Sequence, residues 1–441
     1  GAVHLLDDIS YAVSGLLDEN MGDTCPQSII DALPDYTADE IREAYDELYE
    51  LKKAGQLFAQ DDYIDVSRYI PVNAPVKALC LHVAHDCNLR CQYCFASTGD
   101  FGQGRKIMPP DIAKKAIDFV IARSGVRHNI EVDFFGGEPL MAWDTVTQTV
   151  DYARSLEEKY NKKFRFTITT NGLLLDEDKR KYINENMDNC VLSLDGRREV
   201  NDEFRKTVAG TGSYDTIVPK FKALVDERDP NLDYYARGTF TSHNLDFAED
   251  VLSIADAGFD RLSVEPVTAD PGCGYDLTED DLPKIEAEYD RLTDIMLERK
   301  KEGKPFTFFH FMVDLDQGPC VVKRLRGCGA GYEYVAVTPD GDIYPCHQFV
   351  GKDEFKQGSV LDQSFNMDIA QKFAGMNIYS RPKCQKCWAK FYCSGGCSAA
   401  NYNMNHDMND SYDLGCEMER KRLECAIYLK AMDKICANQS K

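Results

Sequence analysis

Apolar residues recur at helical spacing in three segments near the beginning of the chain. The first spans residues 5–17, the second begins at Pro26, where a first-turn proline is tolerated, and the third covers residues 38–55. The third segment starts with acidic residues, and its apolar face comprises Ile41, Tyr45, Leu48 and Leu51. Residues 56–66 then read as a short hairpin with an acidic turn. Three helices and a hairpin are typical of a winged-helix domain, which we expect over residues 1–70.

A different pattern follows a proline-containing linker at residues 69–77. Short, apolar, β-rich runs alternate with amphipathic helical stretches such as residues 111–125 and 146–160. The six runs are residues 77–85, 130–137, 164–172, 189–196, 234–242 and 261–267. Strands with helical crossovers predict a parallel β/α sheet whose ligands gather at the carboxyl ends of the strands. We therefore expect an α/β fold, a partial (β/α)6 barrel resembling a TIM barrel, over residues 76–310.

The remaining residues, 311–441, form a third predicted domain, which is rich in cysteine. Residues 328–346 contain two alternating strands joined by Asp340-Gly341, a strong short-range hairpin signal. Cys328 and Cys346 lie at the outer ends of these strands. A C-x2-C-x5-C-x3-C run and one later thiol follow, at Cys384, Cys387, Cys393, Cys397 and Cys416.

Composition and charge narrow the functional classes. The 441 residues include 51 Lys plus Arg and 74 Asp plus Glu, so the formal net charge is −23. This charge repels phosphate backbones and anionic lipid surfaces, so we expect neither nucleic acid nor a membrane as partner. No stretch approaches the ~18–20 apolar residues of a membrane span, and we expect a soluble, cytoplasmic protein. Seventeen cysteines in a reducing compartment favour metal binding over a disulfide scaffold.

The first cysteine motif, CNLRCQYC, follows the strand predicted at residues 77–85. Its thiols, Cys87, Cys91 and Cys94, suit three corners of an iron–sulfur cubane and leave the fourth iron open to a small chelating molecule. The sequence GGEP at the end of the next strand lets the backbone approach an ammonium group closely, because glycine has no side chain. A structural zinc site and a plain strand-ending turn are the alternative interpretations of these two motifs.

Together these motifs resemble the radical S-adenosylmethionine (SAM) enzymes, over about residues 76–267. The resemblance implies that the three thiols hold the reducing 4Fe-4S cluster and that Tyr93 lies near the adenine of SAM. It also implies that the methionine ammonium is received by Gly136, Gly137, Glu138 and Pro139. Ser193 and Arg205 match positions that hold the carboxylate or order the ribose side. The alternative for these two is a capping serine and a surface arginine.

The third domain is similar to the SPASM extension of radical SAM enzymes, which binds two auxiliary 4Fe-4S clusters. The resemblance implies one cluster on Cys384, Cys387, Cys393 and Cys416, and another on Cys328, Cys346 and Cys397. The second set is one thiol short, which implies either an open iron or a fourth ligand from Cys320; a zinc ribbon is the alternative for the four-thiol set. Sulfatase maturases place another cysteine in the hairpin and an aspartate after its second thiol, where this chain has His347.

The combination resembles the maturases of Cys-rich SCIFF peptides and related sactipeptide or ranthipeptide synthases. The resemblance implies intramolecular thioether formation in a ribosomally made precursor peptide, whose leader is bound by the N-terminal domain through strand addition. It also implies an electron donor such as a ferredoxin or flavodoxin and a low-oxygen setting. The competing hypotheses are a peptide or protein dehydrogenase and an iron–sulfur or zinc scaffold without catalysis.

Overall fold

The structure, a computed structural model, describes residues 2–65, 74–315 and 320–439. The chain forms two compact units. One is built on the first 70 residues and includes the last turns of the C-terminal helix, and the other comprises residues 71–313 and 320–429.

The N-terminal unit contains the three predicted helices, which are α1 (Asp8–Ser14), α2 (Gln27–Ala32) and α3 (Ala38–Lys53). Thr37 and Glu40 form a capping box that fixes the start of α3, because each side chain hydrogen-bonds to the other's backbone N–H. The predicted apolar face of α3 is buried at Ile41, Tyr45 and Leu48 and packs with α1 and α2. Local caps and one shared apolar core therefore explain this part of the fold.

The hairpin predicted at residues 56–66 is wrong for its described part. Residues 56–62 are turns and irregular backbone, and residues 63–65 are helical. Phe58 adopts a left-handed conformation with φ of 54°, which interrupts the alternation that a strand requires. A two-stranded ribbon also needs a hydrophobic face to pack on, and Tyr63 and Ile64 are exposed here. The winged-helix assignment is therefore not confirmed, and Val66 lies outside the described residues.

The large unit is built on one sheet that contains all six predicted strands in parallel neighbouring positions. These strands are β1 (Ala78–His85), β3 (Asn129–Gly136), β4 (Lys163–Thr170), β5 (Asn189–Ser193), β6 (Asp233–Phe240) and β7 (Arg261–Pro266). A short parallel strand, β8 (Thr307–Phe308), extends the series. The sheet order has two ends, β12 and β8, so the described sheet is open.

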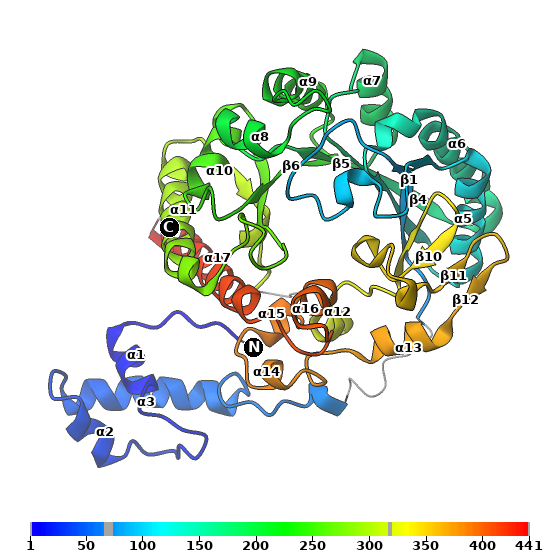
Figure 1. The fold of residues 1–441 in the computed structure, drawn as a ribbon. Coiled ribbons are helices and arrows are strands. Elements are labelled where there is room, and N and C mark those ends of the chain that lie inside the picture. Colours follow the sequence, from blue (N-terminus) through cyan, green and yellow to red (C-terminus); the bar gives the residue numbers. More distant parts are fainter. Residues whose placement is uncertain (1, 66–73, 316–319, 440–441) are drawn as a thin grey trace. The chain divides into compact units, whose positions relative to one another are not determined.

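Crossover helices connect these parallel strands and lie on the outer side of the sheet (Figure 1). They are α5 (Pro110–Arg123), α6 (Trp143–Tyr160), α7 (Glu177–Asn186), α8 (Arg198–Phe204), α9 (Tyr214–Asp226), α10 (Phe247–Asp256) and α11 (Leu282–Lys301). Buried and exposed positions alternate along β3, whereas every residue of the central strand β1 is buried. The carboxyl ends of β1 and β3 to β7 meet at one rim, as the sequence predicts.

The predicted hairpin of the third domain is also formed, by β9 (Tyr334–Val337) and β10 (Asp342–Tyr344). Gly341 has a φ of 86°, which is why glycine suits this turn. Strand β9 pairs in parallel with β1, and the sheet continues through β10 into β11 (Gly358–Ser359) and β12 (Ser364–Phe365). Residues on both sides of the predicted boundary at 310 and 311 therefore share one sheet.

Helices of the cysteine-rich part carry Cys384, Cys393, Cys416, Cys425 and Cys436. The helices of this part are α12 (Val321–Arg326), α13 (Met367–Gly375), α14 (Pro382–Gln385), α15 (Lys390–Cys393), α16 (Ser398–Asn405) and α17 (Asp413–Gln439). Single 3-10 turns are η1 (Ser97–Gly99), η2 (Pro139–Ala142), η3 (Glu279–Asp281), η4 (Phe309–Phe311), η5 (His347–Phe349) and η6 (Asp353–Phe355), and β2 (Lys106–Ile107) pairs with β1.

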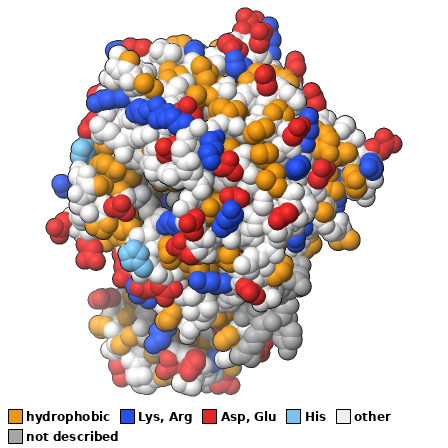
Figure 2. All heavy atoms as spheres, turned by 45° about the vertical axis from the view of Figure 1, so that its right-hand side comes forward, with side chains coloured by type: hydrophobic (Ala, Val, Ile, Leu, Met, Phe, Trp, Pro, Cys, Tyr) orange, Lys and Arg blue, Asp and Glu red, His pale blue; other side chains and the backbone are white. Residues whose placement is uncertain are grey.

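Acidic and basic side chains are interspersed over the face drawn in Figure 2. Among the helices that the structure describes, none combines the length and apolar character needed to cross a membrane.

Candidate functional site

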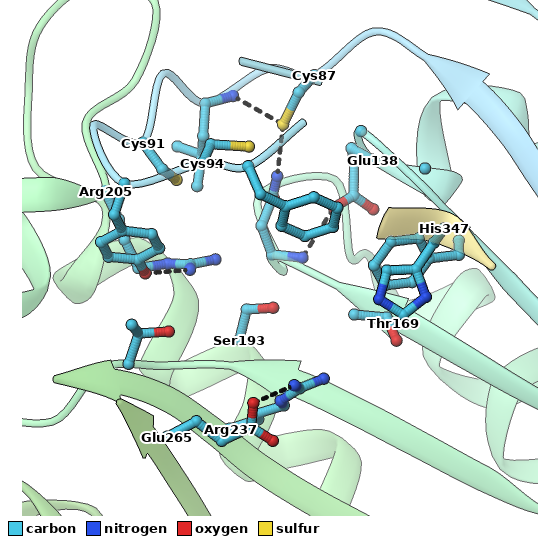
Figure 3. Close-up of a pocket in the computed structure, with 18 of the residues that line it drawn as sticks. Cys87, Cys91, Cys94, Glu138, Thr169, Ser193, Arg205, Arg237, Glu265 and His347 are labelled. Carbon is cyan, nitrogen blue, oxygen red and sulfur yellow. Dashed lines mark hydrogen bonds and ion pairs between the residues drawn. The ribbon is translucent and has the colours of Figure 1, made fainter. Parts of the chain in front are cut away.

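The thiols of Cys87, Cys91 and Cys94 lie on the loop that leaves β1, and all three line one cavity of about 240 Å³ at the rim of the sheet (Figure 3). The Cys87 sulfur accepts hydrogen bonds from the Leu89 backbone N–H, at 3.4 Å, and from the Asn171 side-chain amide, at 3.5 Å. Burial raises the pKa of Cys87 to about 12 and that of Cys91 to about 11. Burial thus favours the neutral thiols, and thiolates at these positions would need a positively charged partner.

Gly136 and Gly137 end β3 directly against the cysteine loop. A Cβ atom on Gly136 would lie 2.2 Å from the Ala84 carbonyl oxygen, and one on Gly137 would lie 2.2 Å from that of Asp86. Their close approach is fixed by backbone hydrogen bonds from Gly137 to Ala84 and from Glu138 to Asp86. Both glycines are therefore required here by the packing of two loops, and both line the cavity.

Glu138 is fully buried and links the ends of β3 and β4. Its carboxylate accepts hydrogen bonds from the Leu140 backbone, the Thr170 hydroxyl and the Asn171 backbone, at 2.8–3.0 Å. Burial raises the pKa of Glu138, and these hydrogen bonds oppose that effect. The carboxylate thus holds in place the turn at residues 169–172, at the end of β4. Pro139 begins the buried turn η2.

A hydrogen-bonded network beside the thiols comprises Tyr93, Asp195 and Arg205. The Tyr93 hydroxyl donates to Asp195 at 2.5 Å and accepts a hydrogen bond of 2.9 Å from Arg205. Arg205 is 8% exposed, and its Nε atom is buried without a hydrogen-bond partner among the described residues. The alternative of a surface arginine is therefore wrong. A buried donor without a partner indicates space for an acceptor of a bound molecule.

The far wall of the cavity comes from later strands and from the third predicted domain. Ser193 ends β5, and the Arg237 guanidinium donates to the Glu265 carboxylate across β6 and β7 at 2.6 Å. The His347 ring lies 5.0 Å from the Phe135 ring, and its Nδ1 atom is 3.2 Å from the Tyr334 hydroxyl. Burial lowers the pKa of His347 to about 4.

Several of these residues carry no assigned role in the sequence-based prediction. Asn171 and Asp195 lie in the short sequences TTNG (residues 169–172) and SLDG (residues 193–196), at the carboxyl ends of two predicted strands. Arg237 and Glu265 carry a clear signal, because charged residues are rare inside strands that are otherwise apolar. His347 is marked in the sequence only by its place after Cys346.

A second cavity is lined by four thiols, three on helices and one between two of these helices. It contains Cys384 of α14, Cys393 of α15 and Cys416 of α17, together with Cys387 between the first two helices. These are the four residues that the SPASM resemblance groups into one cluster. Burial raises the pKa of Cys393 to about 12 and that of Cys416 to about 11.

Cys328, Cys346 and Cys397 form a third set. Cys346 lies at the end of the hairpin and is buried, and the thiols of Cys397 and Cys328 are near enough to add to the burial that raises its pKa. Cys320 is exposed at the start of α12. Among the thiols outside the three sets, Cys80, Cys190 and Cys425 are buried, whereas Cys273 and Cys436 are exposed.

Among the described residues, no three His, Cys, Asp or Glu side chains are grouped as ligands of one metal ion. Three thiols on one cavity wall, with N–H donors to sulfur and a buried arginine nearby, are instead a donor set that fits an iron–sulfur cluster. The unpartnered Arg205 Nε and the glycine-lined rim fit a small polar molecule beside it. The residues present therefore fit both groups.

Two family models match separate parts of the chain. The radical SAM superfamily model matches residues 81–234, and the model of the SPASM iron–sulfur cluster-binding domain matches residues 328–388. A cysteine-type anaerobic sulfatase-maturating enzyme of Clostridium novyi is 25% identical over 350 residues, which cover 75% of this chain and 90% of the relative.

Solved structures share the fold. The structure of anSMEcpe with bound AdoMet has a TM-score of 0.67 at 20% identity and covers 83% of this chain and all of its own. Streptococcus suis SuiB bound to precursor peptide SuiA has a TM-score of 0.53 at 16% identity and covers 93% of each chain. The matched domains imply SAM and 4Fe-4S clusters as cofactors. With its strand-end thiols and its cysteine-rich C-terminal part, the chain therefore combines a radical SAM domain with a SPASM domain.

Proposed function

We propose that the protein forms intramolecular thioether bonds, from cysteine sulfur to carbon, in a ribosomally made, Cys-rich precursor peptide. The observation that carries the proposal is that residues of both predicted domains line one cavity. The radical SAM motifs of β1 and β3 form one side, and His347 and Gln348 of the SPASM part form another. A peptide that enters this cavity meets both parts of the enzyme.

When bound, SAM and a reduced 4Fe-4S cluster supply one-electron chemistry that removes a hydrogen atom from an unactivated carbon. Cys87, Cys91 and Cys94 would hold that cluster. Tyr93, Ser193 and Arg205 would orient SAM, and the backbone at Gly136, Gly137 and Glu138 would receive its ammonium group. The Glu138 carboxylate keeps this rim rigid through its three hydrogen bonds.

Electron balance favours a role for the two further thiol sets. Forming one carbon–sulfur bond removes a hydrogen atom from carbon, and a proton and one electron from the thiol. Activation of SAM consumes one electron, so one electron enters and one leaves in each turnover. Thiol sets at Cys384, Cys387, Cys393 and Cys416 and at Cys328, Cys346 and Cys397 would hold clusters that accept the departing electron. A ferredoxin or flavodoxin is proposed as the donor.

The N-terminal unit is proposed to hold the leader segment of the peptide. Its small core leaves Tyr11 74% exposed and Leu16 44% exposed, which suits the docking of an apolar peptide segment. SuiB, which shares the fold, has been solved with a precursor peptide, and this supports a peptide as substrate.

The competing function is a peptide dehydrogenase that oxidises a Ser or Cys side chain, because sulfatase-maturating enzymes are among the relatives. The cavity carries an imidazole at His347, where the resemblance places an aspartate base in sulfatase maturases. The His347 ring is also held between Phe95 and Phe135, with its Nδ1 beside Tyr334. This arrangement supports thioether formation over dehydrogenation.

The test is an anaerobic reaction of the protein with SAM, dithionite and a short Cys-rich peptide encoded beside its gene. Thioether formation predicts loss of one alkylatable thiol for each link and no carbonyl that reacts with hydrazine. A hydrazine-reactive product would establish the dehydrogenase instead. Removal of residues 1–70 should weaken peptide binding and leave cleavage of SAM in place. A peptide-binding scaffold without catalysis would form no 5′-deoxyadenosine.

A further inference from the structure

The two auxiliary thiol sets are joined by a loop of unusual backbone geometry. Cys393 belongs to the four-thiol set and Cys397 to the three-thiol set. Between them, Ser394, Gly395 and Gly396 have φ values of 60°, 89° and 72°, so three consecutive residues are left-handed. The loop therefore sets how closely the two thiol sets approach each other.

The buried side chain of Arg381 holds this loop in place through hydrogen bonds. Its side chain donates one hydrogen bond to the Gly395 carbonyl and another, of 2.8 Å, to the Ser398 hydroxyl. A Cβ atom on Gly395 would lie 2.2 Å from the Arg381 Nη1 atom. The glycine is therefore required both by its positive φ and by the guanidinium packed against it.

The guanidinium of Arg381 is buried without an acidic partner. The residue is 3% exposed, and its Nε atom has no hydrogen-bond partner among the described residues. Two other buried arginines of the chain differ from each other: Arg205 lies near the Asp195 carboxylate, whereas Arg228 donates only to carbonyl and amide oxygens. No ion pair between described residues includes Arg381. A buried cation of this kind is costly unless an anion lies beside it.

Cysteines of both auxiliary sets interact electrostatically with Arg381. Burial lowers the pKa of Arg381, and four thiols oppose that effect, namely Cys384, Cys393, Cys397 and Cys328. Two of these belong to the four-thiol set and two to the three-thiol set. The guanidinium is thus electrostatically coupled to both sets.

We propose that Arg381 is a charge-compensating and positioning residue shared by the two auxiliary clusters, and that it raises the reduction potential of both. The inference rests on the proposed function, which places a cluster on each thiol set. One-electron reduction adds one negative charge to a cluster and makes or breaks no bond. A fixed positive charge nearby stabilises the reduced state, and therefore favours acceptance of the electron that leaves the peptide.

The test compares Arg381→Gln with Arg381→Lys and with a matched control, Lys372→Gln, which removes an exposed positive charge on α13. Iron and sulfide content is measured first, and the midpoint potentials are then obtained by redox titration followed by electron paramagnetic resonance. In Arg381→Gln, both auxiliary signals should move to more negative potential, while the signal of the SAM-binding cluster stays in place. Arg381→Lys should restore most of the difference, and Lys372→Gln should change nothing.

The outcomes separate the inference from the proposed function. Unchanged auxiliary potentials in Arg381→Gln, or equal shifts in the Gln and Lys variants, would overturn the role of the charge. If Arg381→Gln loses iron while Arg381→Lys keeps it, the charge is required for cluster assembly, and the inference stands. If both variants lose iron, Arg381 acts only through its hydrogen bonds. A wild-type protein that lacks about eight of the expected irons would instead contradict the proposed function.

Discussion

The side-chain amide of Asn171 donates a hydrogen bond to the Cys87 sulfur, with Nδ2 and Sγ 3.5 Å apart. The two residues belong to different strand-end motifs, and Glu138 fixes their approach by accepting a hydrogen bond from the Asn171 backbone N–H at 2.8 Å. The amide can therefore act on the charge of a cluster ligand, because N–H donors to sulfur stabilise the more negative, reduced state.

We expect Asn171→Ala to make the SAM-binding cluster harder to reduce. The variant removes the N–H donor and leaves the backbone bond to Glu138 in place. The potential is measured by redox titration of the reduced cluster's paramagnetic signal. Asn231→Ala, in an exposed turn beside Asp229, is the control and should behave as wild type. An unchanged potential in Asn171→Ala would show that the amide serves only to order the loop.

A second prediction concerns the network around Arg205. Tyr93→Phe removes the hydroxyl that joins Asp195 to Arg205 and should leave the arginine less well oriented for SAM. Hydrogen bonds to charged groups contribute roughly 1.5–3 kcal/mol, so we expect SAM to bind about tenfold more weakly or worse by calorimetry. Tyr152→Phe is the matched control, because its hydroxyl donates to the exposed Asp118 far from the cavity. Equal affinity in the two variants would exclude this role of the network.

Much of the fold follows from local pattern. The strand β4 could be predicted because Phe164, Phe166 and Ile168 alternate with polar residues between two amphipathic helices. The hairpin expected at residues 56–66 is not formed in its described part, where Tyr63 and Ile64 are exposed. A strand needs neighbours to pack against, and the local sequence does not reveal whether they are present.

The candidate site could be predicted in part for a related reason. The cysteines and the GGEP turn stand out by residue type and spacing. The roles of Asp195 and Glu138 depend on partners far along the chain, since Glu138 binds Asn171 33 residues later and Tyr93 meets Asp195 across 102 residues. Such pairings arise from the sheet, where strand ends converge, and a motif alone does not contain them.

The iron content of the protein tests how the cysteines are divided among the three proposed clusters. If ten cysteines serve three clusters, the anaerobically reconstituted protein should carry about twelve irons, and replacing Cys87, Cys91 and Cys94 with alanine should remove about four. Cys190→Ala, at a buried thiol outside the three sets, should keep the full complement. Zinc in place of iron would contradict the cluster assignment.

The ligation of the three-thiol set gives a further prediction. We expect Cys320→Ala to keep its clusters and most of its activity, because a cluster with an open iron on Cys328, Cys346 and Cys397 needs no fourth thiol. Peptide should then perturb the spectrum of the cluster on Cys328, Cys346 and Cys397, and a peptide with its bonding cysteine changed to serine should not. Loss of about four irons in Cys320→Ala would show that this thiol completes the cluster.

The most direct measurement of the central claim follows one hydrogen atom and one thiol in the same reaction. The precursor peptide is deuterated at the candidate acceptor carbons and incubated anaerobically with the protein, SAM and dithionite. Thioether formation predicts that deuterium appears in 5′-deoxyadenosine and that one alkylatable thiol is lost for each deuterium transferred. Deuterium transfer with an unchanged thiol count, or with a new hydrazine-reactive carbonyl, would contradict the account.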